Sequence, residues 1–151
     1  MSTYPETIIT EALFAHLATM PGLATLLQSS TSTPPIAYPN AEFTPPKAAD
    51  GTAKPYLRVN DVPSPPDGID LPGRYIRRGG TLQVSVFWPL GVGIMAPKEA
   101  AGAIAERFAL NTIIERGTQR IRISQPPRVT SEIIESDIVS IPVLIQYDVL
   151  P

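Results

Sequence analysis

The sequence predicts an α+β fold: a mostly antiparallel twisted sheet with two main helices packed on one face, a protruding hairpin and a proline-rich extended arm. Residues 82–88 alternate with period 2, with Leu82, Val84, Val86 and Trp88 on one face and Gln83, Ser85 and Phe87 on the other, which is typical of a strand. Residues 97–108 then repeat apolar side chains at helical spacing. Residues 137–148 form the longest alternation in the chain and predict a second long strand. A strand and a helix with one apolar stripe each predict two packed layers.

Size and composition predict one domain over residues 1–151, since a chain of this length buries a core and its apolar fraction of 43% is near the globular average. Cysteine is absent, which excludes disulfides, thiolate zinc sites and a cysteine nucleophile. The net charge of −2 gives no overall case for binding nucleic acid or an anionic membrane. No apolar run approaches the roughly 18–20 residues of a membrane span, and Glu6 and Glu11 stand where a signal peptide is basic. We expect a soluble intracellular protein.

The first helix is expected over residues 3–20. Thr3 and Glu6 have the spacing of a capping box, and Pro5 suits the first turn, where its missing N–H is no loss. A proline-rich segment follows at residues 29–54, and its prolines exclude a central strand. We interpret it as an extended arm at the sheet edge with a flexible tip at residues 48–54. Residues 56–62 alternate again and predict a strand.

The second half of the chain predicts a hairpin and two more strands. Residues 62–73 form a turn-rich loop, and residues 74–78 are expected to turn through Gly79-Gly80 into the long strand. Residues 119–124 alternate apolar and basic side chains and predict a strand. Pro142, inside the last strand, indicates an edge or bulged position. The matching apolar stripes predict a core of Ile9, Leu13, Leu17, Ile104, Phe108, Leu82, Val84, Val86, Val143 and Ile145.

The residues show no catalytic set, and no cofactor or metal is expected. His16, the one histidine, lies on the apolar side of the first helix and is interpreted as structural. The turn at 91–93 lacks the further glycine and the Gly-Lys-Ser/Thr ending of phosphate loops. Asp67 and Asp70 share a loop that could hold Ca²⁺, but EF-hand spacing is absent, and a solvated loop is the better interpretation.

Arginine makes up nine of the 12 basic residues. Arg74, Arg77 and Arg78 flank the expected hairpin, and Arg120 and Arg122 lie on one strand. Three interpretations stay open: a solvated face with ion pairs, an interface between subunits, or contact with DNA phosphates. As candidate interface residues we take Arg74, Arg77, Arg78, Asp67 and Asp70. As a basic strand that faces a lumen or a partner we take Arg120 and Arg122.

Three segments together resemble a known family. They are YPN-x-x-F-x-P at residues 38–45, RGG-x-LQV-x-VF-x-PLG-x-G at residues 78–93 and IPVLIQY at residues 141–147. In their order they are similar to phage and prophage proteins related to the tail terminators of long-tailed phages. The resemblance covers nearly the whole chain. It implies a small α+β subunit that closes as a ring, often a hexamer, on the end of the tail tube.

The resemblance implies a structural role in virion assembly and no enzymatic activity. Such a ring stops tube growth and offers a surface to the head-completion or neck proteins. The implied partners are further copies of the chain, the tail tube protein and a neck protein, with DNA passing through the lumen without sequence-specific binding and no membrane. The implied location is the virion tail, and the host cytoplasm during assembly. Two alternatives stay open: a small intracellular ligand-binding module or enzyme that uses the 91–93 turn, or another head–tail connector or tail-tube subunit.

Overall fold

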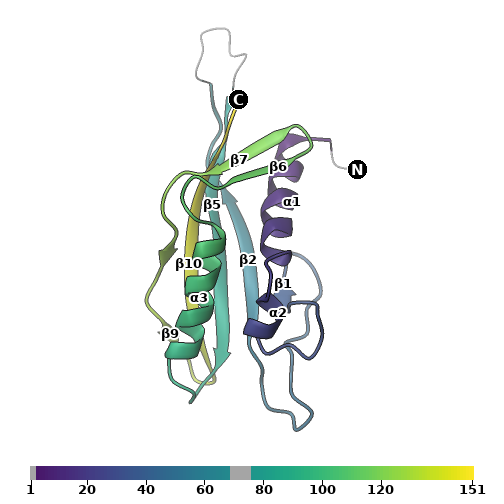
Figure 1. Cartoon of the computed structure of the whole chain (residues 1–151), viewed down its shortest axis with the longest axis vertical. Coiled ribbons are helices and arrows are strands. Elements are labelled where there is room, and N and C mark those ends of the chain that lie inside the picture. The colour runs from purple at the N-terminus through teal and green to yellow at the C-terminus, as the bar shows by residue number, and fades with distance from the viewer. Residues whose placement is uncertain (1–2, 69–75) are drawn as a thin grey trace.

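Two long antiparallel strands form the centre of the fold in the computed structural model (Figure 1), which describes residues 3–68 and 76–151. β5 (Gly79–Pro89) and β10 (Ile138–Val149) pair from Ile138 opposite Pro89 to Asp148 opposite Gly79. Both strands are predicted by alternation, and both alternate between buried and more exposed residues. The remaining strands of the main sheet pair either with β5 or β10 or with a strand that does so.

The main sheet has the order β1-β2-β5-β10-β7-β6, and β8 and β9 also pair with β10, at residues that precede those paired with β7. Among the strands of the described residues, only the β1–β2 pair is parallel. A separate two-stranded sheet joins β3 and β4. The bounds are β1 (Ile36–Ala37), β2 (Tyr56–Pro63), β3 (Asp67–Gly68), β4 (Ile76–Arg77), β6 (Ile113–Arg116), β7 (Gln119–Ile123), β8 (Arg128–Val129) and β9 (Ile133–Ile134).

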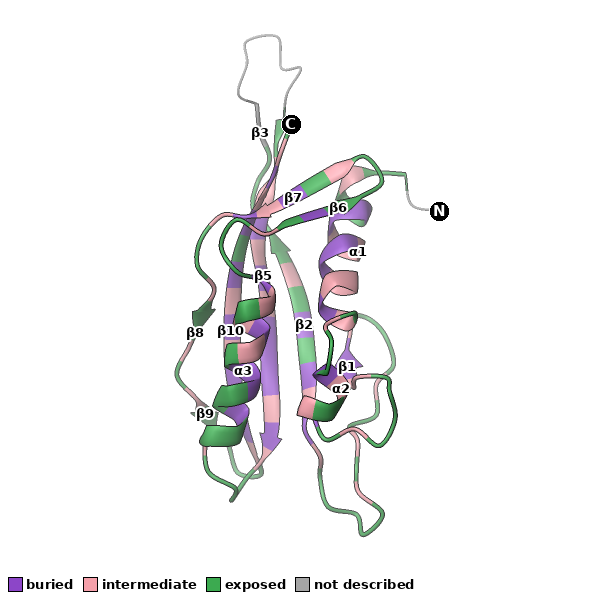
Figure 2. Cartoon of the chain, in the orientation of Figure 1, coloured by how far each residue is buried: buried purple, intermediate pink, exposed green. Residues whose placement is uncertain are grey.

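The two long helices, α1 (Pro5–Ala18) and α3 (Met95–Arg107), lie on the same face of the sheet (Figure 1), and a short helix, α2 (Leu23–Leu26), follows α1. Their apolar stripes and that of the sheet form one core (Figure 2). All ten predicted core residues belong to it, and each is at most 5% exposed. The opposite face carries exposed or half-buried side chains such as Arg58, Gln83 and Gln146.

The sheet curls around α1 at one end. The β6–β7 hairpin bends over and packs on α1 (Figure 1). Arg116 of β6 forms an ion pair with Glu11 of α1 at 3.8 Å. None of the helices in the described part of the chain has the length and apolar character that a membrane span requires.

The capping box expected at the start of α1 is wrong. The N-cap is Tyr4, which makes no side-chain capping bond, and Pro5 is the first helical residue. Pro5 has no N–H to satisfy, which lowers the need for a cap. The Glu6 side chain reaches Arg78 instead, with 3.4 Å between Glu6 Oε1 and Arg78 Nε.

The turn expected at Gly79-Gly80 is also wrong, because both glycines lie inside β5. A Cβ atom on Gly79 would lie 2.7 Å from the carbonyl oxygen of Tyr147. On Gly80 it would lie 2.6 Å from the Val62 carbonyl oxygen and 2.9 Å from the Tyr147 hydroxyl oxygen. The glycines are therefore required by the close approach of neighbouring strands rather than by a turn.

Pro142 was expected at an edge or bulge, but it lies in β10, which has partners on both sides. Its carbonyl oxygen accepts hydrogen bonds from the N–H and the hydroxyl of Thr130, at 3.0 and 2.8 Å. The N and C=O of one strand residue point to the same side. The missing N–H of Pro142 therefore faces the stretch between β8 and β9, where the pairing is interrupted.

The arm is confirmed as an edge segment, since β1 pairs only with the start of β2. Its tip is a hydrogen-bonded hairpin, which we call the arm hairpin (residues 47–54). Lys47 and Ala53 form a β-bridge, and Ala48 N–H donates to the Thr52 carbonyl oxygen at 2.8 Å. The mobility of this tip stays a prediction. Of the strand expected at residues 74–78, β4 covers Ile76–Arg77, and residues 74 and 75 lie outside the described residues.

Gly80→Ala is expected to lower the free energy of unfolding by about 1–3 kcal/mol, because its Cβ would collide with backbone atoms that cannot rotate away. The matched control is Gly102→Ala on the exposed side of α3, where a Cβ meets nothing within 4 Å. Alanine there should raise stability by about 0.5–1 kcal/mol. Urea unfolding of both variants is the measurement, and equal effects of the same sign would contradict the close-approach explanation.

Candidate functional site

A cleft of about 720 Å³ lies between the N-terminal half of α1 and the ends of β2, β5 and β10. We call it the α1 cleft. Ile9 and Phe14 line it from the helix. Pro63, Pro65 and Pro66 line it from the end of β2 and the segment after it. It is an apolar, concave surface with a few polar groups, which is the usual character of a binding site.

Asp61 is the most unusual residue of this cleft. It follows Leu57 and Val59 at period 2 and therefore points to the helix-covered face of the sheet. Its Oδ1 accepts a hydrogen bond from the Tyr147 hydroxyl at 2.5 Å, and its Oδ2 accepts one from the Thr10 hydroxyl at 2.7 Å. Such contacts compensate a carboxylate for lost hydration. The Asp61 carboxylate therefore joins α1, β2 and β10.

The Tyr147 hydroxyl is held as a hydrogen-bond donor. Burial is the largest influence that raises its pKa, and the hydrogen bond to Asp61 and the charge of that carboxylate raise the pKa further. Gly80 leaves room for this hydroxyl, because any larger residue would place its Cβ 2.9 Å from the hydroxyl oxygen. Gly80, Asp61 and Tyr147 thus form one unit on three adjacent strands.

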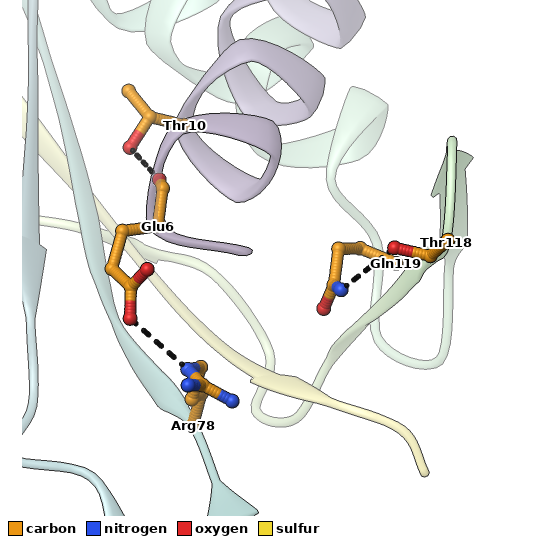
Figure 3. A network of polar contacts seen from close by, with 5 residues as sticks. All are labelled: Glu6, Thr10, Arg78, Thr118 and Gln119. Atoms are coloured by element: carbon orange, nitrogen blue, oxygen red, sulfur yellow. Dashed lines mark hydrogen bonds and ion pairs between the residues drawn. The ribbon is translucent and has the colours of Figure 1, made fainter. Parts of the chain in front are cut away.

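The rim of the α1 cleft carries the Glu6–Arg78 ion pair, which links the start of α1 to the residue before β5 (Figure 3). The Glu6 side chain is 69% exposed and that of Arg78 is 28% exposed. The Thr10 hydroxyl oxygen also lies 3.1 Å from the carbonyl oxygen of Glu6, one turn earlier in the helix (Figure 3), so its one proton is shared between this oxygen and Asp61 Oδ2. An ion pair this exposed contributes little to stability, so it can exchange partners at small cost.

The candidate interface residues are brought together only in part. Arg77 lies in β4 opposite Asp67 of β3 in the backbone register, and Arg78 follows it. Arg77 is exposed, and Arg78 forms an ion pair with Glu6 of its own chain. Asp70 and Arg74 lie outside the described residues. Contact of this set with a neighbouring subunit stays a prediction.

Arg120 and Arg122 lie on the helix-free face, where each pairs with an acid on the next strand. Arg122 Nη2 and Nε donate to the two carboxylate oxygens of Asp148 at 2.7 and 3.2 Å. Arg120 lies 3.4 Å from Glu115, which stands directly opposite in the register. Exposed cross-strand ion pairs account for both arginines. Their role toward a lumen or a partner stays a prediction.

The same face carries a row of aromatic rings. Tyr56 and Phe87 stand opposite each other and stack with centroids 4.9 Å apart and planes 9° apart. Phe43 of the arm packs on Tyr56 at 5.2 Å, and the Arg58 guanidinium lies 5.5 Å from the centre of the Phe87 ring. These contacts attach the arm to the sheet.

His16 has the structural role predicted for it. Its Nε2–H donates to the carbonyl oxygen of Arg107, and Arg107 Nε–H donates back to the carbonyl oxygen of His16, both at 3.0 Å. Burial is the main cause that lowers the pKa of His16, the hydrogen bond to Arg107 opposes it, and the Arg107 charge adds to the lowering. The exchange ties the last turn of α1 to the last turn of α3.

The turn at 91–93 is explained by backbone conformation. Gly91 and Gly93 have φ angles of +95° and +79°, which other residues rarely adopt. Leu90, Val92 and Met95 beside them are 45–74% exposed. Across the described residues no group of three or more His, Cys, Asp or Glu side chains could hold a metal ion.

Comparison with solved structures identifies the fold. One solved chain, whose name states no role, has 22% sequence identity and a TM-score of 0.76, over 99% of this chain and 98% of that one. A second comes from a structure titled "Virion of native gene transfer agent (GTA) particle", with 18% identity and a TM-score of 0.61, over 98% of both chains. A search of curated proteins found no match.

The one-sided sheet, the curled end and the projecting arm therefore define a recurrent class of small α+β protein. The family model described as "Phage tail terminator protein" matches residues 8–147, and the chain belongs to this family. The family is one of structural proteins of the phage tail.

Sequence reasoning missed Asp61 and Tyr147, although a signal for both was present. Asp61 follows Leu57 and Val59 in the alternation of β2, so its side chain points to the same buried face of the sheet. Tyr147 follows Val143 and Ile145 in the same way on β10. A carboxylate at an inward position requires a donor. A tyrosine whose side chain points to the same buried face from another strand can donate a hydrogen bond from its hydroxyl to that carboxylate.

Tyr147→Phe is expected to lower the free energy of unfolding by about 1–3 kcal/mol, because it removes a hydrogen bond to a carboxylate that is partly shielded from water. The matched control is Tyr56→Phe, whose hydroxyl has no hydrogen bond within the described residues and should cost less than about 0.5 kcal/mol. Denaturant unfolding compares the two. Equal costs would show that the Asp61 contact does not stabilise the cleft.

Proposed function

We propose that the protein forms a ring on the end of a phage tail tube, where it stops tube growth and provides the joint to the head. The observation that supports this most strongly is the family match, which spans residues 8–147 and so includes α3, all of α1 except its first three residues, and the main sheet except the last two residues of β10. The proposed assembly is a closed homo-oligomer, a hexamer by the family resemblance, with head-to-tail contacts.

The shape of the subunit supports the proposal. One sheet face is covered by α1 and α3, while the other carries ion pairs and stacked rings and stays partly exposed. The β3–β4 sheet and the arm hairpin lie toward opposite ends of the molecule (Figure 1). The solved chain from the gene transfer agent virion has the same fold, which is consistent with a place in a virion tail.

The proposal assigns partners and surfaces. Subunits contact the tail tube protein on one side of the ring and a head-completion or neck protein on the other. DNA passes through the lumen without sequence-specific binding. Arg77 and Arg78, with Asp67, Asp70 and Arg74, contribute to the contact between subunits, and Arg120 and Arg122 face the lumen or a partner. Assembly takes place in the host cytoplasm, and the finished protein resides in the virion tail.

The alternatives predict different behaviour. A tail-tube subunit would repeat along the tube, and a head–tail connector would bind heads without affecting tube length. A ligand-binding module that uses the 91–93 turn gains no support from the geometry, since the turn is an exposed apolar segment and the α1 cleft lies elsewhere.

The direct test is tail assembly in a phage or prophage strain that lacks this protein. Without a terminator, tube polymerisation has no stop at its growing end, so electron microscopy should show overlong tubes with no capping ring. Complementation with the wild-type chain should restore uniform length. Tubes of normal length in the strain that lacks the protein would contradict the proposal.

A further inference from the structure

We propose that the α1 cleft of one subunit receives the arm hairpin of the next subunit in the ring. This inference rests on the proposed function, since it gives the head-to-tail contact that closes the ring. It concerns two surfaces of the chain: the apolar cleft beside α1 and the hairpin of residues 47–54.

The arm hairpin is an ordered and narrow projection. Lys54 N–H donates to the Pro46 carbonyl oxygen at 3.0 Å, and Thr52 N–H donates to Asp50 Oδ1 at 3.0 Å. Gly51 has a φ angle of +87°, which permits the tight turn. Between its two lysines the sequence is Ala-Ala-Asp-Gly-Thr-Ala, so the side chains are small. A hairpin of this kind enters a concave surface without large rearrangement.

The arm hairpin carries two lysines and one carboxylate, Asp50, whose Oδ1 accepts a hydrogen bond from Thr52 N–H, so its net charge is opposite to that of the α1 cleft. Lys47 and Lys54 make no ion pair within the described part of the chain. The α1 cleft has an apolar lining and two carboxylates, Glu6 on its rim and Asp61 on its floor, against one cation, Arg78. The exposed Glu6 carboxylate can turn from Arg78 to a lysine of the incoming hairpin.

The positions of the two surfaces exclude a contact within one chain. The arm hairpin precedes the first residue of β2, whereas the α1 cleft is lined by Asn60, Asp61 and Pro63 at the other end of this strand, and by Pro39 from the part of the arm before the hairpin. Eight residues of strand separate these ends by roughly 23 Å, at about 3.3 Å per residue. Figure 1 shows the segment between β1 and β2 extending toward one end of the long axis and the N-terminal turn of α1 lying toward the other. A hairpin at one end and a receptor at the other give a heterologous contact, which closes into a ring when the rotation allows it.

The absence of cysteine from the sequence makes a cross-linking test clean. Ala49→Cys lies on the exposed turn of the arm hairpin, and Ser64→Cys lies on the exposed wall of the α1 cleft. Tails assembled with the double variant are oxidised and separated on a denaturing gel without reductant. We expect a ladder of covalent oligomers that ends at the copy number of the ring, because each subunit then links to both neighbours.

Three controls decide how the ladder is interpreted. Ala49→Cys alone and Ser64→Cys alone should give no species larger than a dimer, since each subunit then has one thiol. The matched pair of Ala49→Cys with Gln125→Cys uses an exposed loop residue that does not line the α1 cleft, and it should give no ladder. A ladder of equal yield from this pair would overturn the proposal.

Charge reversal tests the same contact independently. Lys47→Glu with Lys54→Glu, in the double-cysteine background, should reduce the ladder at least tenfold, while Lys47→Arg with Lys54→Arg should keep it. If tails with the parent double-cysteine variant carry the ring but give no ladder, or if the lysine-to-glutamate variant gives an undiminished ladder, the hairpin contact is overturned and the proposed function is left standing. Tails of normal length that carry no ring would instead overturn the proposed function.

Discussion

The pairing of β5 with β10 is the constraint on which the rest of the structure depends. It aligns two long strands in one register, so that the apolar stripes of both strands face the same side. Burial of that single face requires α1 and α3. The other face is left with ion pairs and stacked rings, each of which tolerates water. One register thus determines both the core and the face that stays uncovered.

The same register determines where the core ends. Tyr147 continues the inward stripe of β10, and its partner across β5 is Asp61 on β2. Gly80 lies between them, and its lack of a side chain lets the hydroxyl reach the carboxylate. The side chains that face α1 are therefore polar at this end of the sheet, and the helix and the sheet do not pack tightly there. The α1 cleft is the result.

Sequence periodicity predicted the elements that bury one face. The strands of residues 56–62, 82–88 and 137–148, the two long helices and all ten core residues follow from local patterns of side chains, and the structure confirms them. These predictions succeed because burial repeats along a single segment and is visible within it.

Sequence reasoning failed where a residue is determined by a distant part of the chain. The Gly79-Gly80 pair was predicted as a turn, but the reason for glycine is the proximity of Val62 and Tyr147. Pro142 is tolerated because β8 and β9 leave its nitrogen unopposed. Asp61 and Tyr147 are separated by 86 residues, and nothing local pairs them. Such contacts require the topology to be known first.

The central claim is that this chain, a member of the phage tail terminator family, forms a single closed ring at one end of each tail. A three-dimensional reconstruction of intact tails by electron cryo-microscopy tests it most directly. The account predicts a single ring of this chain at one end of the tube, with the rotational symmetry of the tube. Copies repeated along the tube, or an end that lacks this chain, would contradict it.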